Sequence, residues 1–200
     1  QKSTRSVLSD IKARNGWQAG DRVRVVVHSF KPLKYLEVAA VMADAVKEVA
    51  AEQIVEFAFV NVVQDHPFKL VDLQQLGKPT KTGGKKAELV PERGVSAQLG
   101  TSTRLICMNG PTLVKREVSP LPSPLLLHLH PLSTYVDQTY LTEQVLKFSS
   151  LSWRSTLPAY QPVTIFYSEL IASLLARLEK VPDWSPAVLN TKLRASRWFL

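Results

Sequence analysis

Cysteine and long apolar runs are what this sequence of 200 residues has least of. Cys107 is the single cysteine, which excludes an intramolecular disulfide and a multi-cysteine metal site. No apolar run reaches the roughly 20 residues that a membrane-spanning helix needs. The chain opens with Gln1 instead of Met and shows no signal peptide. We therefore expect a cytoplasmic location, no membrane partner, and a longer polypeptide of which residues 1–200 are a part.

Acidic residues are fewer than basic residues in this sequence. The chain has 25 Lys and Arg against 17 Asp and Glu, a formal net charge of +8. Such a charge predicts an anionic partner, either a nucleic acid or an acidic membrane surface. With 45% hydrophobic and 21% charged residues, the composition excludes a disordered, collagen-like or coiled-coil chain. It is enough for one domain with a sizeable core.

The first 64 residues have the pattern of an α/β protein. Apolar spacing predicts helices over residues 3–15 and 34–52. Strands are predicted over Arg22–Ser29, where three consecutive valines suggest burial on both faces, and over Val55–Gln64. A strand, a helix and a strand of these lengths form a βαβ unit, so the two strands are expected to be parallel neighbours.

The rest of the chain predicts shorter elements separated by turns. Residues 77–86 contain three glycines, four lysines and a proline, and are expected to form a loop. The glycine spacing there is not that of a phosphate-binding loop, although its lysines can still meet a phosphate backbone. A tight turn is expected at Pro91–Gly94. Strands are predicted over 68–73, 105–108 and 125–130, and helices over 139–148 and 168–178. We find no repeat and no linker that would divide the domain.

Histidine and cysteine offer few catalytic candidates. His128 and His130 point to one face of a strand, as two metal ligands would, but a structural pair is the stronger interpretation. Cys107 lies in an apolar stretch and is expected to be a buried, inert thiol. His28 ends a predicted buried strand, the place where ligands gather in α/β sheets. A core histidine is an equal alternative there.

Basic and aromatic residues interleave near the end of the chain. Ser152, Arg154, Ser155 and Thr164 have side chains that can hydrogen-bond phosphate oxygens. The alternative is a surface loop whose aromatic residues complete the core. The chain then ends in Trp198-Phe199-Leu200, three large apolar residues that are expected to fold inward together with the terminal carboxylate.

Several segments together resemble the C-terminal portion of the PIWI domain of a prokaryotic Argonaute. They are Phe57–Leu73, Pro91–Gly94, Leu125–His130, Gln144–Leu175 and the Trp198–Leu200 ending. The resemblance implies a ribonuclease H-like α/β fold, with a mixed sheet flanked by helices. It also implies that the MID domain and the first PIWI strands lie upstream of this chain, and that the protein binds a guide strand paired with a target strand.

The resemblance also bears on catalysis. Slicing members of the family hold two divalent metals with three acidic residues and a fourth ligand. The second aspartate of that set is expected at the end of Arg22–Ser29, where His28 stands, and the fourth ligand near Ser123–Leu125, where Pro124 stands. Both departures predict a non-slicing protein of the short or inactive long branch. Such proteins act with an effector, for example a sirtuin-like, TIR or nuclease module.

Binding residues can be carried over from the resemblance as well. It implies that the guide backbone is contacted by Ser152, Arg154, Ser155, Thr164, Tyr167 and Lys69. The carboxylate of Leu200 would help to bind a structural Mg²⁺ at the guide 5′ phosphate. We favour a guide RNA and a target DNA, in defence against invading DNA. Two alternatives stay open: a metal-dependent, guide-directed endonuclease, and a structural α/β domain that serves a protein partner.

Overall fold

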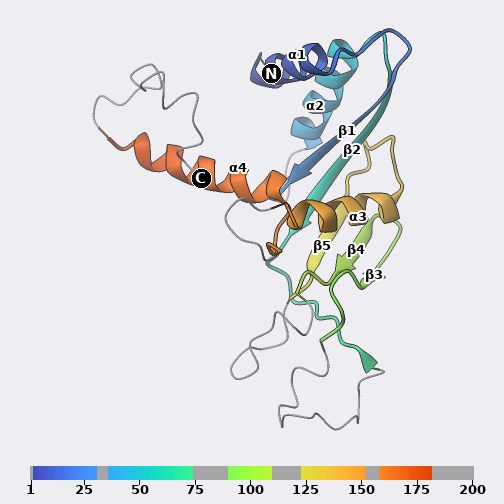
Figure 1. The fold of residues 1–200 in the computed structure, drawn as a ribbon, viewed down its shortest axis with the longest axis vertical. Helices are drawn as coiled ribbons and strands as arrows, with labels where there is room; N and C mark the ends of the chain where they lie inside the picture. The colour runs from blue at the N-terminus through green and yellow to red at the C-terminus, as the bar shows by residue number, and fades with distance from the viewer. Residues whose placement is uncertain (1, 31–35, 74–89, 110–122, 152–157, 182–200) are drawn as a thin grey trace. The chain divides into compact units, whose positions relative to one another are not determined.

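The chain forms a five-stranded mixed sheet with helices, seen in a computed structural model (Figure 1). The structure describes residues 2–30, 36–73, 90–109, 123–151 and 158–181. It divides into two compact units, residues 1–142 and 143–200. Within the described residues, no helix is both long and apolar enough to span a bilayer.

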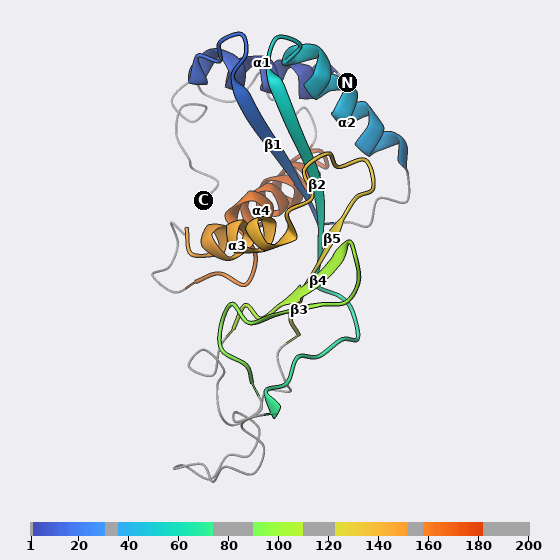
Figure 2. The same ribbon diagram turned by 90° about the vertical axis from the view of Figure 1, so that its right-hand side faces the viewer.

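The first unit is built on the predicted βαβ arrangement. It begins with α1 (Lys2–Asn15), β1 (Arg22–Ser29), α2 (Leu36–Val49) and β2 (Ile54–Val63). The two strands are parallel over their full pairing, from Arg22 opposite Ile54 to Ser29 opposite Asn61. Figure 2 shows them as the two longest strands, running side by side. The parallel pairing predicted from the sequence is therefore confirmed.

Three shorter strands complete the sheet. They are β3 (Ser96–Gln98), β4 (Thr103–Ile106) and β5 (Leu125–Leu129), and the strand order is β1-β2-β5-β4-β3. All pairings other than β1 with β2 are antiparallel. A tight turn with Gly94 at a φ of 91° precedes β3, as expected. That backbone conformation is one that glycine adopts without strain.

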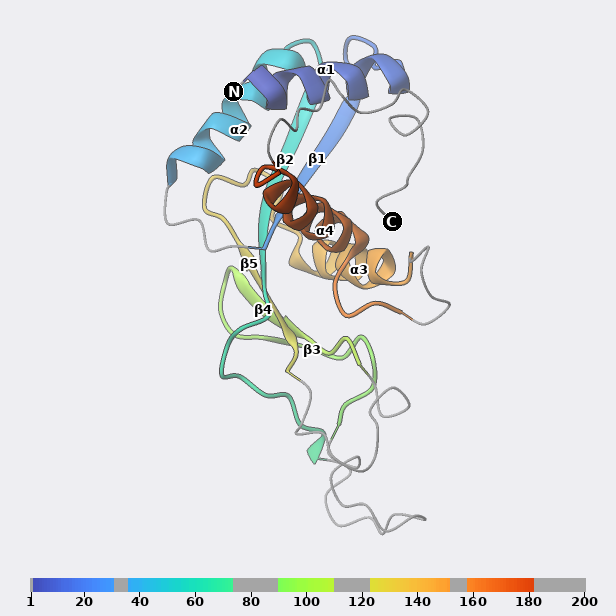
Figure 3. The ribbon, with the colours of Figure 1, turned by 90° about the vertical axis from the view of Figure 1, so that its left-hand side faces the viewer.

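Helices α1 and α2 cover one face of β1 and β2. The apolar cluster between them contains Leu8, Ala39, Val46, Phe57 and Phe59, all at most 8% exposed. Phe57 and Phe59 are two residues apart in β2 and so share that face. Figures 1, 2 and 3 all show α1 and α2 next to each other. Burial of these side chains fixes the register, because a one-residue slip would turn both phenylalanines away from the helices.

Residues 130–135 continue along β2 where β5 has ended. Regular strand pairing has ended here, and side-chain hydroxyls accept hydrogen bonds from β2 amides. The amide of Phe57 donates to Thr134 Oγ1 at 2.9 Å, and that of Phe59 donates to Ser133 Oγ at 3.0 Å. The short polar residues after the strand therefore satisfy buried amides of a central strand.

The second unit contains most of α3 (Gln138–Ser149) and all of α4 (Val163–Leu178). The sequence placed the start of α4 at Ser168, five residues too late. Val163, Thr164, Ile165 and Phe166 are poor helix formers in isolation, but Ile165 is 1% exposed and packing favours the helix. The amides of Ile165 and Phe166 both donate to the carbonyl of Pro162, where the helix begins.

Other expectations are corrected. Residues 68–73 form no strand: Phe68, Val71 and Leu73 are 46%, 43% and 69% exposed, and no ladder pairs them. The strand expected at Leu105–Met108 lies two residues earlier, as β4, and the three-residue β3 was not predicted. The three consecutive valines of β1, residues 25–27, are half-buried instead of buried on both faces, because β1 is the edge of the described sheet. In α1, Leu8 is buried but Val7 and Ile11 are exposed.

Candidate nucleic-acid interface

His28 lies near the carboxyl end of β1, where the sequence placed it. It stands opposite Val60 of β2 and is half-buried. Burial lowers the pKa of its imidazole to about 4. The ring is therefore neutral near pH 7, and it brings no negative charge to a position where the resemblance expects a carboxylate. Mg²⁺ takes oxygen ligands, so a neutral imidazole is a poor substitute there.

Pro124 immediately precedes β5, and its carbonyl oxygen lies 2.7 Å from Nε2 of His66. A carbonyl only accepts, so Nε2 carries the proton. This contact ties the chain after β2 to the start of β5. It leaves Pro124 with a structural contact and no side-chain ligand to offer a metal.

The structure does not bring the two predicted catalytic positions together. Val60 pairs with both His28 and Leu129, and Pro124 lies five residues from Leu129 along the chain. At about 3.3 Å per residue and about 4.8 Å per strand, His28 and Pro124 are roughly 19 Å apart. Two-metal hydrolysis needs cations about 4 Å apart, so these two positions do not belong to one metal site.

Lys69 lies in the same corner as His66 and Pro124. Its ammonium group donates to the hydroxyl of Ser123, and Lys69 itself is exposed. The ring centres of His66 and Phe68 lie 5.8 Å apart with the ring planes tilted by 40°, a contact within the irregular segment. The structure thus presents Lys69 to solvent from a segment fixed by side-chain contacts instead of strand pairing.

Of the candidate residues in the C-terminal unit, the structure describes Thr164 and Tyr167. Thr164 is exposed in the first turn of α4. Tyr167 is only 9% exposed, with its ring 5.1 Å from that of Phe166, so it offers little surface to a ligand. Ser152, Arg154, Ser155 and Leu200 lie outside the described residues.

An arginine enclosed by tyrosines was not predicted. Arg24 Nε and Nη2 donate to Glu56 Oε2 at 2.8 and 2.6 Å, and this bond raises the pKa of Arg24. The guanidinium carbon lies 3.7 Å from the ring centre of Tyr135 and 4.7 Å from that of Tyr140. Arg24 is thereby engaged by a carboxylate and two rings. The sequence gives little sign of this contact. Predicting it requires the register of β1 on β2, which places Arg24 opposite Glu56.

The remaining histidines and the cysteine act structurally. His128 Nδ1 lies 3.0 Å from Thr103 Oγ1, and His130 Nδ1 accepts the amide of Leu132 at 3.2 Å. Burial, and then the nearby His128, lower the pKa of His130. Cys107 is 4% exposed and burial raises the pKa of its thiol, as expected for an inert cysteine. In the part of the chain that the structure describes, no group of three or more His, Cys, Asp and Glu side chains is placed to hold a metal.

Positive charge is distributed unevenly along the chain. Twelve of the 25 Lys and Arg, but only three of the 17 Asp and Glu, fall outside the described residues. Those segments therefore carry a formal charge of +9, and the described residues carry −1. The excess of cations that predicted an anionic partner belongs entirely to residues 31–35, 74–89, 110–122, 152–157 and 182–200.

Comparison with known proteins gives relatives along the whole chain, although no protein-family model matches it. The chain is 50% identical over 202 residues to "Protein argonaute" of Cereibacter sphaeroides (strain ATCC 17025 / ATH 2.4.3). The match covers 100% of this chain and 26% of the relative, so the chain spans about a quarter of that protein's length.

Solved structures share the fold at low identity. One is Clostridium butyricum Argonaute bound to a guide DNA and a 19-mer target DNA, with a TM-score of 0.63 and 19% identity over 88% of this chain and 20% of that one. Another is the C-terminal lobe of a budding yeast Argonaute, with a TM-score of 0.60 and 10% identity over 98% and 43%. A third, Aa-Ago with externally bound siRNA, has a TM-score of 0.56 and 14% identity over 88% and 21%. These similarities confirm the predicted α/β PIWI-type fold.

Proposed function

The chain is a relative of the Argonaute proteins along its whole length, and we propose that it is the C-terminal portion of a guide-dependent nucleic-acid-binding module that does not slice its target. The observation that carries this proposal is the 50% identity over the complete chain. The chain is a quarter of that relative, so the activity concerns the full-length protein that contains it. The module would bind a guide strand, RNA in our proposal, and a target DNA strand.

Charge supports a phosphate-binding role. The +9 carried outside the described residues includes Arg154, beside Ser152 and Ser155, and the four lysines of residues 77–86. Each cation that contacts a phosphate releases a condensed counterion, so affinity falls with salt in proportion to the number of contacts. Exposed Lys69 and Thr164 add donors from the described residues.

The absence of slicing rests on His28. A neutral imidazole stands where the resemblance expects an acidic metal ligand, and burial opposes its charging. Pro124 contributes less to this proposal than the sequence suggested, because it lies far from His28. The resemblance implies that the other two acidic residues of the slicing set lie upstream or at the edge of this chain, so the test of cleavage uses the full-length protein.

Binding is tested on the full-length protein with labelled guides. Arg154→Ala should weaken all guide sequences alike and reduce the slope of log K against log salt by about 0.7 for a single-stranded guide. Arg177→Ala, an exposed arginine in the last turn of α4, is the matched control and should leave the slope unchanged. A sequence-selective loss would contradict a backbone contact.

Cleavage is tested with the guide-loaded protein, a matched target, and Mg²⁺ or Mn²⁺. We expect no product. Product formation would establish the alternative, a metal-dependent endonuclease. Absence of any affinity for a guide–target duplex at about 0.15 M salt would favour a structural domain that serves a protein partner.

Three further parts of the proposal concern the C-terminal carboxylate, an effector protein and the cellular location. The carboxylate of Leu200 would help hold Mg²⁺ at the guide 5′ phosphate, where a hard cation screens two anionic groups. A sirtuin-like, TIR or nuclease effector would act on the bound target, in defence against invading DNA. The protein would work in the cytoplasm. Co-purification from the host with and without guide loading would identify the effector.

A further inference from the structure

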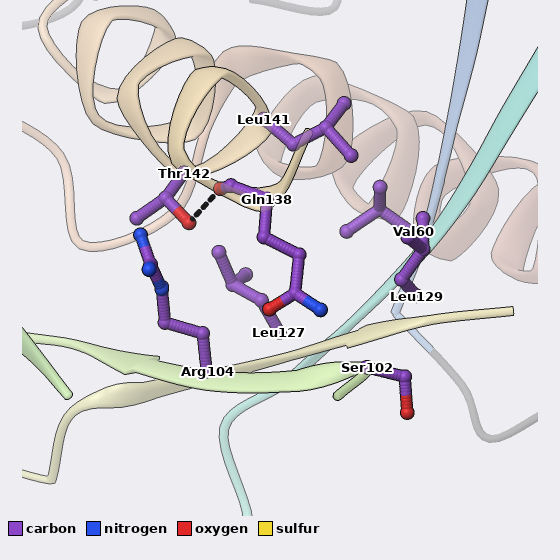
Figure 4. Close-up of a pocket in the computed structure, with 8 residues that line it drawn as sticks. All are labelled: Val60, Ser102, Arg104, Leu127, Leu129, Gln138, Leu141 and Thr142. Atoms are coloured by element: carbon purple, nitrogen blue, oxygen red, sulfur yellow. Dashed lines mark hydrogen bonds between the residues drawn. The ribbon is translucent and has the colours of Figure 1, made fainter. Parts of the chain in front are cut away.

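A small cavity lies between the sheet and the first turn of α3 (Figure 4). The empty space around the residues that line it is about 220 Å³, a figure that includes open solvent, so the enclosed part has room for little more than one water molecule. Four apolar side chains form most of its wall: Val60, Leu127, Leu129 and Leu141. Four polar residues complete the lining: Ser102, Arg104, Gln138 and Thr142. Figure 4 shows Arg104 reaching up from β4 and Gln138 reaching down from α3 into the same space.

Two of the lining residues each have a buried polar atom with no hydrogen-bond partner in the protein: Nε of Arg104 and Oε1 of Gln138. The other polar atoms of both side chains are used. Arg104 donates to Thr139 Oγ1 and to Gln98 Oε1, each at 3.3 Å, and Gln138 Nε2 donates to the carbonyl of Thr101. Buried polar groups in native proteins nearly always have a partner, so this donor and this acceptor are expected to bond to a molecule from outside the chain.

We propose that this cavity holds one ordered water molecule that bridges Arg104 and Gln138. A water accepts from Arg104 Nε and donates to Gln138 Oε1, satisfying both atoms at once. Its second proton can be donated to Oγ1 of Thr142, which uses its own proton on the carbonyl of Gln138 at 2.6 Å. Three polar partners are the usual number for a buried water.

Other occupants fit less well. An anion would accept from Arg104 but would meet the lone pairs of Gln138 Oε1. An apolar molecule would match Leu127 and Leu141 but leave both polar atoms without partners. Only a molecule that donates and accepts satisfies the site.

The bridge gives Arg104 and Gln138 a shared role. Arg104 belongs to β4 and Gln138 is the first residue of α3, so the water links the sheet to the start of the helix. Two direct hydrogen bonds, from Gln138 to Thr101 and from Arg104 to Thr139, also link the start of α3 to β4 and the residues just before it. The start of α3 is thereby held to β4 by polar contacts beside an apolar cavity.

Crystal structures at about 1.5 Å of the full-length protein test the proposal. We expect a density peak within about 2.7–3.2 Å of both Arg104 Nε and Gln138 Oε1. Gln138→Met, which keeps the side-chain length without the oxygen, should lose the peak. Gln98→Met, which removes another hydrogen bond of Arg104, is the matched control and should keep it.

An empty cavity in the wild-type protein would overturn the proposal, and that structure decides the question even if a variant fails to fold. A peak retained in Gln138→Met, or lost equally in both variants, would show that Gln138 is not a bridging partner. An anomalous signal at this position after a bromide soak would identify an anion site instead.

Discussion

Acidification should destabilise the fold through His28. Burial lowers the pKa of this imidazole to about 4, whereas an unfolded histidine titrates near its ordinary value of 6.5. Between these values the unfolded chain binds a proton that the folded chain does not. The contribution of His28 to stability is therefore complete above pH 6.5 and is lost as the pH falls from about 6.5 to about 4.

The magnitude follows from the difference between the two pKa values. Each unit corresponds to about 1.4 kcal/mol, so a difference of about 2.5 units gives roughly 3 kcal/mol over the whole range. At pH 5, roughly 2 kcal/mol is lost. Marginal stabilities are about 5–15 kcal/mol, so this single group is a substantial part of the acid response.

The assay is chemical denaturation at pH 7 and pH 5, for the wild type and for His28→Gln and His28→Phe. The two replacements differ in polarity and packing, so their stabilities at pH 7 differ, but neither titrates. Both should show an acid-induced loss of unfolding free energy that is about 2 kcal/mol smaller than that of the wild type. An equal acid sensitivity in all three proteins would refute the assignment of a buried, neutral His28.

Three further outcomes are expected. Thr134→Val leaves a buried β2 amide without its acceptor and should cost about 1–3 kcal/mol in unfolding free energy, whereas the exposed Thr101→Val should change it by less than about 0.5 kcal/mol. Replacing the four lysines of residues 77–86 by Gln should reduce the salt slope of duplex binding by up to about 3.6, and an unchanged slope would place that loop outside the interface. The same number of replacements among the basic residues of α1 is the control. Appending a few residues after Leu200 should weaken 5′-phosphorylated guides more than 5′-hydroxyl guides, and equal losses would contradict a carboxylate-bound cation.

The sequence predicts the βαβ half well because its signals are long and redundant. Both strands are eight residues or more, and Phe57 and Phe59 repeat with the strand period. Residues 68–73 are as apolar and as rich in β-favouring residues as those two strands, yet no neighbouring strand pairs with them. Whether a partner strand lies alongside depends on the rest of the fold and cannot be read from the segment itself. The three residues of β3 are too few for any periodicity.

The candidate site was predictable in part. The position of His28 at the end of a strand follows from the sequence alone. Its separation from Pro124 does not, because it depends on the order of the strands and on Val60 pairing with both neighbours. The enclosure of Arg24 depends in the same way on register, and also on residues 130–140 returning along the sheet. Such contacts join distant parts of the chain, and local sequence patterns do not predict them.

Formal charge differs between the described residues and the rest of the sequence. The described residues carry −1, and several of their cations are already engaged: Arg5 with Glu48 at 2.6 Å, Lys12 with the carbonyl of Val49 at 3.1 Å, and Arg24 with Glu56. A phosphate would have to displace these partners. The segments outside the described residues contain twelve cations and only three acidic residues, so by composition they are the candidates for phosphate contacts. If every one of them contacted duplex DNA, the salt slope attributable to this chain would reach about −11. A steeper slope would require cations from the described residues, such as Lys69, or from the rest of the full-length protein. A slope near zero would remove the electrostatic support for nucleic-acid binding by this chain.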